Sequence, residues 1–398
     1  MPRGRRRAGF LALLLGVVSC RHDPSEPAPS PTASASANPS GAETAAPVEA
    51  GLTIDVQPIE VPLVRFGAAA AVDSARARFF IWGGGGAPAD AGARPEGANP
   101  KLLEVVWLGE SRRSTVTLGG AAPAGVFVPA MAHDPYGNGL YVFGGWAKDK
   151  KGPSDGLVRI DTAGDGYMSR PFPKTGRWPA ARNGASLVSD SMGNALWLFG
   201  GDGGPGGAKD AKQFTPLGDL WRFDLDAQRW DRIEDSGDRP PARWHAAMTV
   251  DETGRKAYLF GGAGVEPDAF DARLYELGLT TSTWSLVRAT GDAPPSLQGA
   301  TLTFDPEMRA LVLVGGLRHL PPGPAVASEI WLMDLDRKRW SHIDGGAKVA
   351  RRDHVAGYDT ATRAHYVFGG RVSQTLGDFY EVGEPVTGAL RIRVKRSP

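Results

Sequence analysis

The chain has 398 residues, enough for one large β domain or two ordinary domains, and its 45 Lys and Arg nearly balance its 44 Asp and Glu. With this balance, the chain has no large net positive charge that would indicate nucleic-acid binding and no acidic tail that would indicate a polycationic partner. The 53 glycines and 32 prolines occur beside common aromatic and aliphatic residues, which favours many short strands joined by turns.

The first predicted element is an export signal. "RGRRR" is followed by "AGFLALLLGVV", an apolar stretch too short for a comfortable membrane span. It runs into "VVSC", which resembles the lipobox of bacterial lipoproteins, whose cysteine is acylated after cleavage. Cys20 is the only cysteine of the chain. We predict a signal peptide over residues 1–19 and lipid on Cys20; the alternatives are an ordinary secretory signal or a buried cysteine.

The residue after the cysteine bears on the destination. Arg21 stands there, and not the Asp that favours inner-membrane retention, so the outer membrane is preferred over the inner. The protein is then expected to face the periplasm or the cell surface. Residues 20–50 follow as a lipidated tether, because Pro, Ser and Ala dominate there and cannot build a core.

A repeat fills the rest of the chain, residues 51–398. Six segments end on a glycine pair: "FFIWGG", "LYVFGG", "LWLFGG", "AYLFGG", "LVLVGG" and "HYVFGG". Because the pairs recur every 54 to 61 residues, they indicate architecture, not one phosphate-binding loop. They are Gly83 and Gly84, Gly144 and Gly145, Gly200 and Gly201, Gly261 and Gly262, Gly315 and Gly316, and Gly369 and Gly370.

Each repeat contains four strand-sized pieces. In the fourth repeat these are "HAAMTV", "AYLF", "RLYELG" and "TWSLVRA", separated by turn residues. The fourth pieces carry Trp230, Trp284 and Trp340, which we expect to pack against the following blade.

The glycine pair, the downstream aromatic and the "R-x-H" or "R-x-G" start of the first strand resemble the kelch repeat over essentially residues 52–398. The resemblance implies an all-β fold: a six-bladed kelch-type β-propeller with four antiparallel strands per blade. It also implies that the glycine pair turns the chain sharply and is structural.

Two segments compete for the fourth strand of the last blade. "LTIDVQ", from Leu52, lies at the right distance before the first repeat, and "ALRIRVK" (389–395) has the right pattern. Use of both termini would close the ring and remove strand edges. The sequence does not decide which of the two lies further inside.

The candidate ligand-binding residues are arginines that open first strands: Arg65, Arg182, Arg243 and Arg352. We expect them near one channel mouth, on the face that also carries the long, unequal loops between second and third strands. Guanidinium groups favour carboxylates and phosphates, so an anionic ligand is one prediction. A structural role, with pairing to local carboxylates or carbonyls, is the alternative.

Galactose oxidase shares a propeller of this kind, but its copper cofactor needs a tyrosine joined to cysteine, and the one cysteine is assigned to lipid. No histidine pair has zinc-site spacing, and His245 and His354 occupy the strand-one position of the family as structural residues. No catalytic residue, metal or cofactor is predicted.

The sequence thus predicts a lipid-anchored, monomeric binding scaffold for a protein or glycan, with membrane contact through lipid and no nucleic-acid partner. The alternative is a sugar-processing enzyme that resembles kelch-type sialic acid mutarotases.

Overall fold

The structure is a computed structural model that describes residues 51–86, 98–110, 112–147, 152–164, 166–204, 214–265, 270–320, 323–372 and 384–396. Cys20, the predicted signal peptide and the predicted tether lie outside these residues, as do most of the long loops. The described residues form β-strands and two short 3-10 helices, η1 (Ser74–Arg76) and η2 (Gly346–Lys348), with no α-helix among them. No helix there has the length and hydropathy of a membrane span.

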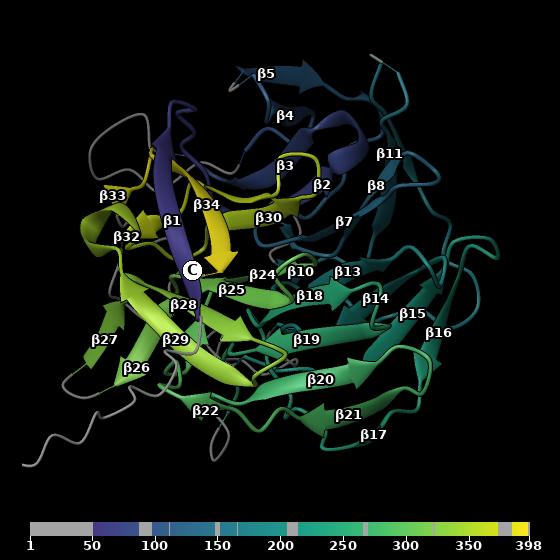
Figure 1. Cartoon of the computed structure of the whole chain (residues 1–398). Helices are drawn as coiled ribbons and strands as arrows, with labels where there is room; N and C mark the ends of the chain where they lie inside the picture. Colours follow the sequence, from purple (N-terminus) through teal and green to yellow (C-terminus); the bar gives the residue numbers. More distant parts are fainter. Residues whose placement is uncertain are drawn as a thin grey trace, which may run out of the picture. The chain divides into compact units, whose positions relative to one another are not determined.

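Six antiparallel sheets are arranged as blades around one centre (Figure 1). From the innermost strand outward, the first three blades are β2 (Phe66–Asp73), β3 (Arg78–Gly85), β4 (Leu102–Trp107) and β5 (Arg112–Thr117); β7 (Ala130–Asp134), β8 (Gly139–Phe143), β11 (Leu157–Asp161) and β12 (Met168–Pro171); and β13 (Ser186–Asp190), β14 (Ala195–Phe199), β15 (Leu220–Asp224) and β16 (Arg229–Ile233).

The other three blades complete the circle. They are β18 (Ala247–Asp251), β19 (Lys256–Phe260), β20 (Leu274–Gly278) and β21 (Thr283–Leu286); β24 (Thr301–Asp305), β25 (Ala310–Val314), β28 (Glu329–Asp334) and β29 (Arg339–Asp344); and β30 (Val355–Asp359), β31 (Ala364–Phe368), β34 (Ala389–Arg396) and β1 (Leu52–Ile59). The innermost strands contact one another around the ring, from β2 through β7, β13, β18, β24 and β30 back to β2. The predicted six-bladed, all-β propeller is confirmed.

Further short strands are of two kinds: some pair with the outermost strands of blades, and others form small sheets beyond the glycine pairs. β6 (Gly119–Gly120), β17 (Ser236–Gly237) and β22 (Thr290–Gly291) pair in parallel with the outer strands of blades two, four and five. Beyond the glycine pairs lie three small sheets: β9 (Trp146–Ala147) with β10 (Gly152–Pro153), β26 (Leu317–Leu320) with β23 (Leu297–Gln298) and β27 (Gly323–Val326), and β32 (Arg371–Val372) with β33 (Glu384–Pro385).

The last blade is closed by both chain ends. β34 pairs with β31 as the third strand, and β1 pairs with β34 as the fourth, so the strand from the N-terminal side is outermost. The two lie side by side in Figure 1. Closure of the ring by strands from both chain ends is confirmed, and the order that the sequence left open is β34, with residues 389–395, inside and β1 outside. Buried Leu390, Ile392 and Val394 suit an inner position, whereas β1 is partly exposed along its length.

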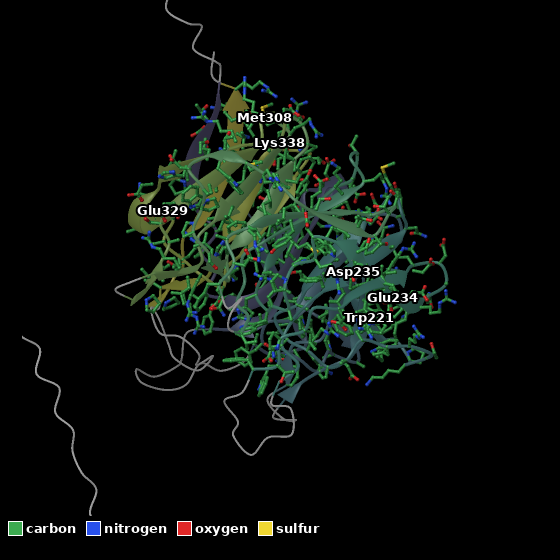
Figure 2. The ribbon with its side chains drawn as sticks, turned by 90° about the horizontal axis from the view of Figure 1, so that it is seen from below. Trp221, Glu234, Asp235, Met308, Glu329 and Lys338 are labelled. Atoms are coloured by element: carbon green, nitrogen blue, oxygen red, sulfur yellow. The ribbon has the colours of Figure 1, made fainter. Side chains whose placement is uncertain are left out.

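The blades have two ends. The short-turn face holds the turns between first and second strands and between third and fourth strands. The long-loop face holds the other connections. In Figure 2, Met308 and Lys338 from the two short turns of blade five lie together and apart from Glu329, which begins β28.

Each glycine pair joins its blade to the next one. The second glycine's N–H donates to the carbonyl of the residue that opens the following first strand, as between Gly201 and Arg243 at 2.9 Å. The other five bonds run from Gly84 to Val126, Gly145 to Arg182, Gly262 to Leu297, Gly316 to Arg351 and Gly370 to Arg65. All twelve glycines have positive φ. The pairs therefore fix the blade-to-blade register through backbone alone.

The core lies between the blades, and the repeated tryptophans fill it. The ring of Trp230 lies 5.5 Å from Phe143, and the same contact recurs between Trp284 and Phe199 and between Trp340 and Phe260. Each phenylalanine stands just before the glycine pair of the preceding blade. The tryptophans therefore pack backward along the chain, and the expected direction, toward the following blade, is wrong.

We predict that Gly262→Val lowers the free energy of unfolding by about 2–3 kcal/mol, because φ is +84° and a Cβ would lie 2.8 Å from the carbonyl oxygen of Trp244. Thermal denaturation measures this effect. Gly109→Val is the control, since a Cβ there meets nothing within 4 Å. A Gly262→Val protein that melts like the control but loses its partner would place the pair in a binding site instead.

Candidate functional site

A ring of backbone hydrogen bonds surrounds the channel near its long-loop end. It contains one residue per blade, and each N–H donates to the ring carbonyl of the preceding blade at 2.7 to 3.2 Å. The six are Gly67, Val128, Gly184, His245, Gly299 and Asp353, all with positive φ. Because the ring is closed, it holds the six first strands at a fixed spacing.

Directly before the ring, each blade places one residue nearer the long-loop face. These six are Phe66, Phe127, Asn183, Trp244, Gln298 and Arg352. Each is bridged to the residue after its own glycine pair: Gly85, Trp146, Asp202, Ala263, Leu317 and Arg371. We call these twelve residues the rim.

The side chains of the rim differ from blade to blade, although the backbone bridges that position them are repeated. Glycine pairs and ring positions repeat because the fold requires their conformations, but equivalent rim positions hold aromatic, amide and charged side chains. A variable set of side chains on a repeated scaffold is where a binding surface can be built without loss of stability. The rim is therefore the candidate site.

Aromatic rings form one part of this surface. Phe214 stacks on Trp244 with ring centroids 4.8 Å apart, and Trp146 is partly exposed. The guanidinium carbon of Arg371 lies 4.8 Å from the centre of the Phe66 ring. Phe66 and Trp244 are buried. Trp146 and Phe214, which lies next to the rim, are partly exposed and offer ring faces for apolar side chains or sugar rings.

A buried charged cluster forms the other part. Arg371 donates from Nε and Nη2 to Asp353 Oδ2, both at 2.9 Å, and Arg352 Nε lies 3.8 Å from the same oxygen. His245 Nδ1 lies 3.8 Å from Asp353 Oδ1. Burial acts to raise the pKa of Asp353, but the charges of Arg371 and Arg352, joined at acidic pH by that of protonated His245, outweigh it and lower that pKa. Burial lowers the pKa of His245. The pair is therefore an ionised carboxylate beside a neutral imidazole at neutral pH.

Two of the predicted arginines have structural partners within their own blades. Fully buried Arg182 binds both carboxylate oxygens of Asp219, at 2.6 and 2.9 Å, and the carbonyl of Gly200. Arg243 likewise donates to the carbonyl of Gly261 and to Asp271 at 3.2 Å. The protein's own acceptors thus compensate both charges.

The sixth blade corrects the register of this motif. Arg182 and Arg243 each reach a glycine 18 positions later, and the residue that does so here is Arg351, which donates to Gly369. The motif "R-x-H" fits residues 352–354 and not 351–353, so the sequence predicts this role for Arg352 and the prediction is wrong by one residue. Consequently Asp353, not His354, is the counterpart of His245. Arg352 belongs to the rim instead.

Arg65 has the right spacing but a different environment. Blade one has Leu102 where blade three has Asp219, so no carboxylate stands in the equivalent place. The guanidinium extends instead to Glu104 at 3.5 Å and remains 21% exposed. The four predicted arginines therefore do not form one group.

Sequence reasoning missed Arg371 and Asp353. Alignment on the glycine pairs would have found both, because Arg371 directly follows the last pair and Asp353 occupies the ring position. Their chemistry was not visible, since nothing in the sequence indicates that residues 18 apart form an ion pair.

The channel itself widens away from the rim. Successive cavities of about 150, 180 and 490 Å³ lead from the ring to the short-turn face. The widest is lined mostly by small and apolar side chains, with Glu252 near its mouth. Within the described ranges, no three His, Cys, Asp or Glu side chains are grouped to hold a metal ion.

Comparison with known proteins decides the family. The model of the KLHDC2/KLHL20/DRC7 Kelch-repeats domain matches residues 130–343 and 203–383, more than half of the chain. The chain belongs to the kelch-repeat family.

Curated relatives share the kelch repeats over part of their length. Human Multiple epidermal growth factor-like domains protein 8 is 32% identical over 200 residues, 48% of this chain and 6% of that protein. Acyl-CoA-binding domain-containing protein 4 of Arabidopsis thaliana is 27% identical over 233 residues, 53% of this chain and 31% of that protein. The chain thus spans less than a third of the length of either.

A solved structure extends the likeness to nearly the whole kelch propeller. The structure of YjhT has a TM-score of 0.61 and 15% identity, and the match covers 85% of this chain and 99% of that one. At this identity the likeness concerns the fold alone.

We predict that Arg182→Met destabilises the kelch propeller by about 2–4 kcal/mol, because it removes the positive charge from Asp219 and a donor from the Gly200 carbonyl. Asp219 then keeps the hydrogen bond from the Trp221 side chain. Arg65→Met is the matched variant and should cost less than about 1 kcal/mol, since its ion pair is long and partly solvated. Chemical denaturation of both proteins measures the difference. Equal losses would show that the assignment of structural and non-structural arginines is wrong.

Proposed function

We propose that this kelch propeller is a lipid-anchored binding module of the bacterial cell envelope, and that its rim takes a protein or glycan partner. The observation that carries the proposal is the non-repeating rim on repeated backbone. Kelch propellers as a class suggest interaction scaffolds, and the rim supplies this one with a surface of its own.

The chemistry of the rim favours a partner with flat or apolar groups over one recognised by charge alone. Arg352 and Arg371 bring two positive charges, but Asp353 and Asp202 stand among them. The partly exposed rings of Trp146 and of Phe214, which stacks on the rim residue Trp244, offer uncharged contact area beside these ion pairs. An acidic group on the partner would therefore add to binding through the arginines without being its main source.

Export and anchoring rest on the lipobox and on Cys20. The long-loop face is then free to meet partners of the periplasm or cell surface, while acyl chains hold the protein at the membrane, preferably the outer one. No second chain is needed to complete the rim, so a monomer suffices.

Capture from envelope extract tests the rim. Immobilised protein carrying Trp146→Ser and Phe214→Ser should retain at least about tenfold less of any partner that the unaltered protein captures. The reason is that loss of two aromatic anchors weakens the binding free energy by about 2 kcal/mol or more. The matched control carries Tyr136→Ser and Met192→Ser, two exposed apolar residues of the short-turn face. If the control loses the partner and the rim variant retains it, the binding surface lies on the short-turn face and our proposal of the rim is wrong.

A second candidate function is the sugar-processing enzyme. The observation in its favour is an ionised carboxylate, a neutral imidazole and two guanidiniums together beside the channel, the groups that acid–base chemistry on a sugar acid requires. Anomer exchange of sialic acid, followed by NMR, tests it. The enzyme predicts an accelerated rate that Asp353→Asn abolishes, whereas an unchanged rate with the unaltered protein eliminates it.

A further inference from the structure

We propose that the short-turn face of blades five and six, beside the start of β1, is a docking surface for an anionic phospholipid bilayer. This surface deepens the proposed lipid-anchored function, because it orients the propeller on the membrane that holds it. The surface itself does not require the anchor, so the two can fail separately.

The chain enters the propeller beside its C-terminal strand. β1 and β34 are antiparallel, and Leu52 is paired with Arg396. The described chain therefore starts beside the end of β34. Arg396 Nη2 lies 3.7 Å from Asp336, which belongs to the turn between β28 and β29. The chain entry and the short turns of blade five are thus neighbours.

Cations gather around this entry. Asp336 is shared by Arg309, at 2.9 Å, and Arg396. The other basic residues of these turns and of the end of β34 are Arg337, Lys338, Arg339, Arg363 and Lys395, and all are exposed. We call these seven basic residues the entry patch.

The entry patch carries excess positive charge. Arg337, Arg363 and Lys395 are paired one to one, with Asp334, Glu307 and Asp55. Arg309 pairs with Asp336 and also with Asp251, at 3.5 Å, and Arg396 shares Asp336. Lys338 and Arg339 enter none of the ion pairs formed between described residues. The seven basic residues thus exceed their five paired carboxylates by two positive charges, those of Lys338 and Arg339.

The same face also carries exposed apolar side chains. Tyr136 and Met192 are 71% and 64% exposed and stand at equivalent positions in the short turns of blades two and three. An amphipathic tyrosine and a flexible apolar side chain suit the headgroup region of a bilayer, and basic residues suit its anionic headgroups. Nucleic acid would use the charges but leave the apolar side chains unexplained, so a bilayer accounts for more of the face.

The predicted tether makes weak attraction sufficient. A flexible chain of about 30 residues has a root-mean-square length of roughly 30 Å, so an anchor at Cys20 would hold the entry patch within reach of the bilayer at high effective concentration. Attraction acts over a Debye length of about 8 Å and needs only to select one orientation.

Vesicle binding tests the surface without the lipid anchor. The protein is the predicted mature chain, residues 20–398 with Cys20→Ser, and the vesicles are phosphatidylcholine with and without phosphatidylglycerol. We expect binding only to the anionic vesicles, weakened by salt. Lys338→Glu with Arg339→Glu should weaken it at least about tenfold. Arg170→Glu with Arg229→Glu changes the same charge at exposed sites of other blades and should retain most of the binding.

Three outcomes overturn the proposal: equal binding to neutral vesicles, equal loss in both charge variants, or binding to duplex DNA without binding to vesicles. Thermal denaturation of both variants verifies that they fold. In cells, Cys20→Ser combined with Lys338→Glu and Arg339→Glu should release the protein from membranes, whereas the Lys338 and Arg339 variant with Cys20 intact should stay. If the triple variant stays membrane-bound and is processed normally, the anchor is wrong while the vesicle result still stands for the entry patch.

Discussion

The hydrogen bond from the second glycine of each pair to the opening carbonyl of the next blade is the interaction on which the structure depends. It links two blades at the same point six times, and it requires two successive residues with positive φ. At Gly261 a Cβ would stand 2.2 Å from the acceptor carbonyl itself. Only glycine meets both conditions without strain, so the most regular sequence feature of the chain has a backbone cause.

This backbone bond, with the ring of six further bonds, allows the rim side chains to differ from blade to blade, although some of them, such as Phe127, also pack in the core. Backbone N–H and C=O groups determine the register and spacing between blades, and the tryptophans of the fourth strands fill the apolar core between them. Phe66, Asn183 and Arg352 can therefore occupy equivalent places with unrelated chemistry. The cost of burying the charges among them is offset locally, by Asp353 for the arginines and by Asn183 for Asp202. A repeat protein of this kind can change its partner without changing its fold.

The glycine spacing and strand pattern were enough to predict six blades, four strands each and closure by both chain ends. The site was predicted less well, because register errors of one residue matter there. Of the consecutive arginines 351 and 352, only Arg352 satisfies the short R-x-H motif, yet the hydrogen bond to Gly369 identifies Arg351 as the structural residue and leaves Arg352 in the rim. The pairing of Asp353 with Arg371 depends on the bridge between first and second strands, a contact that periodicity does not reveal. Long loops carry little periodic pattern, and most of them lie outside the described residues.

Closure by both termini also determines how the two faces can be used. Because β1 is the outermost strand of blade six and runs antiparallel to β34, the chain enters at the short-turn face, opposite the rim. A fourth strand taken from the C-terminal side would instead run from the short-turn face to the long-loop face, so the chain would end beside the rim, and a third strand from the N-terminal side would enter there. The observed order brings Leu52, Arg396 and Asp336 together, so the described chain begins at the short-turn face, on the side opposite the rim. This separation follows from which terminal strand is outermost, and it gives the strand order a functional consequence as well as a structural one.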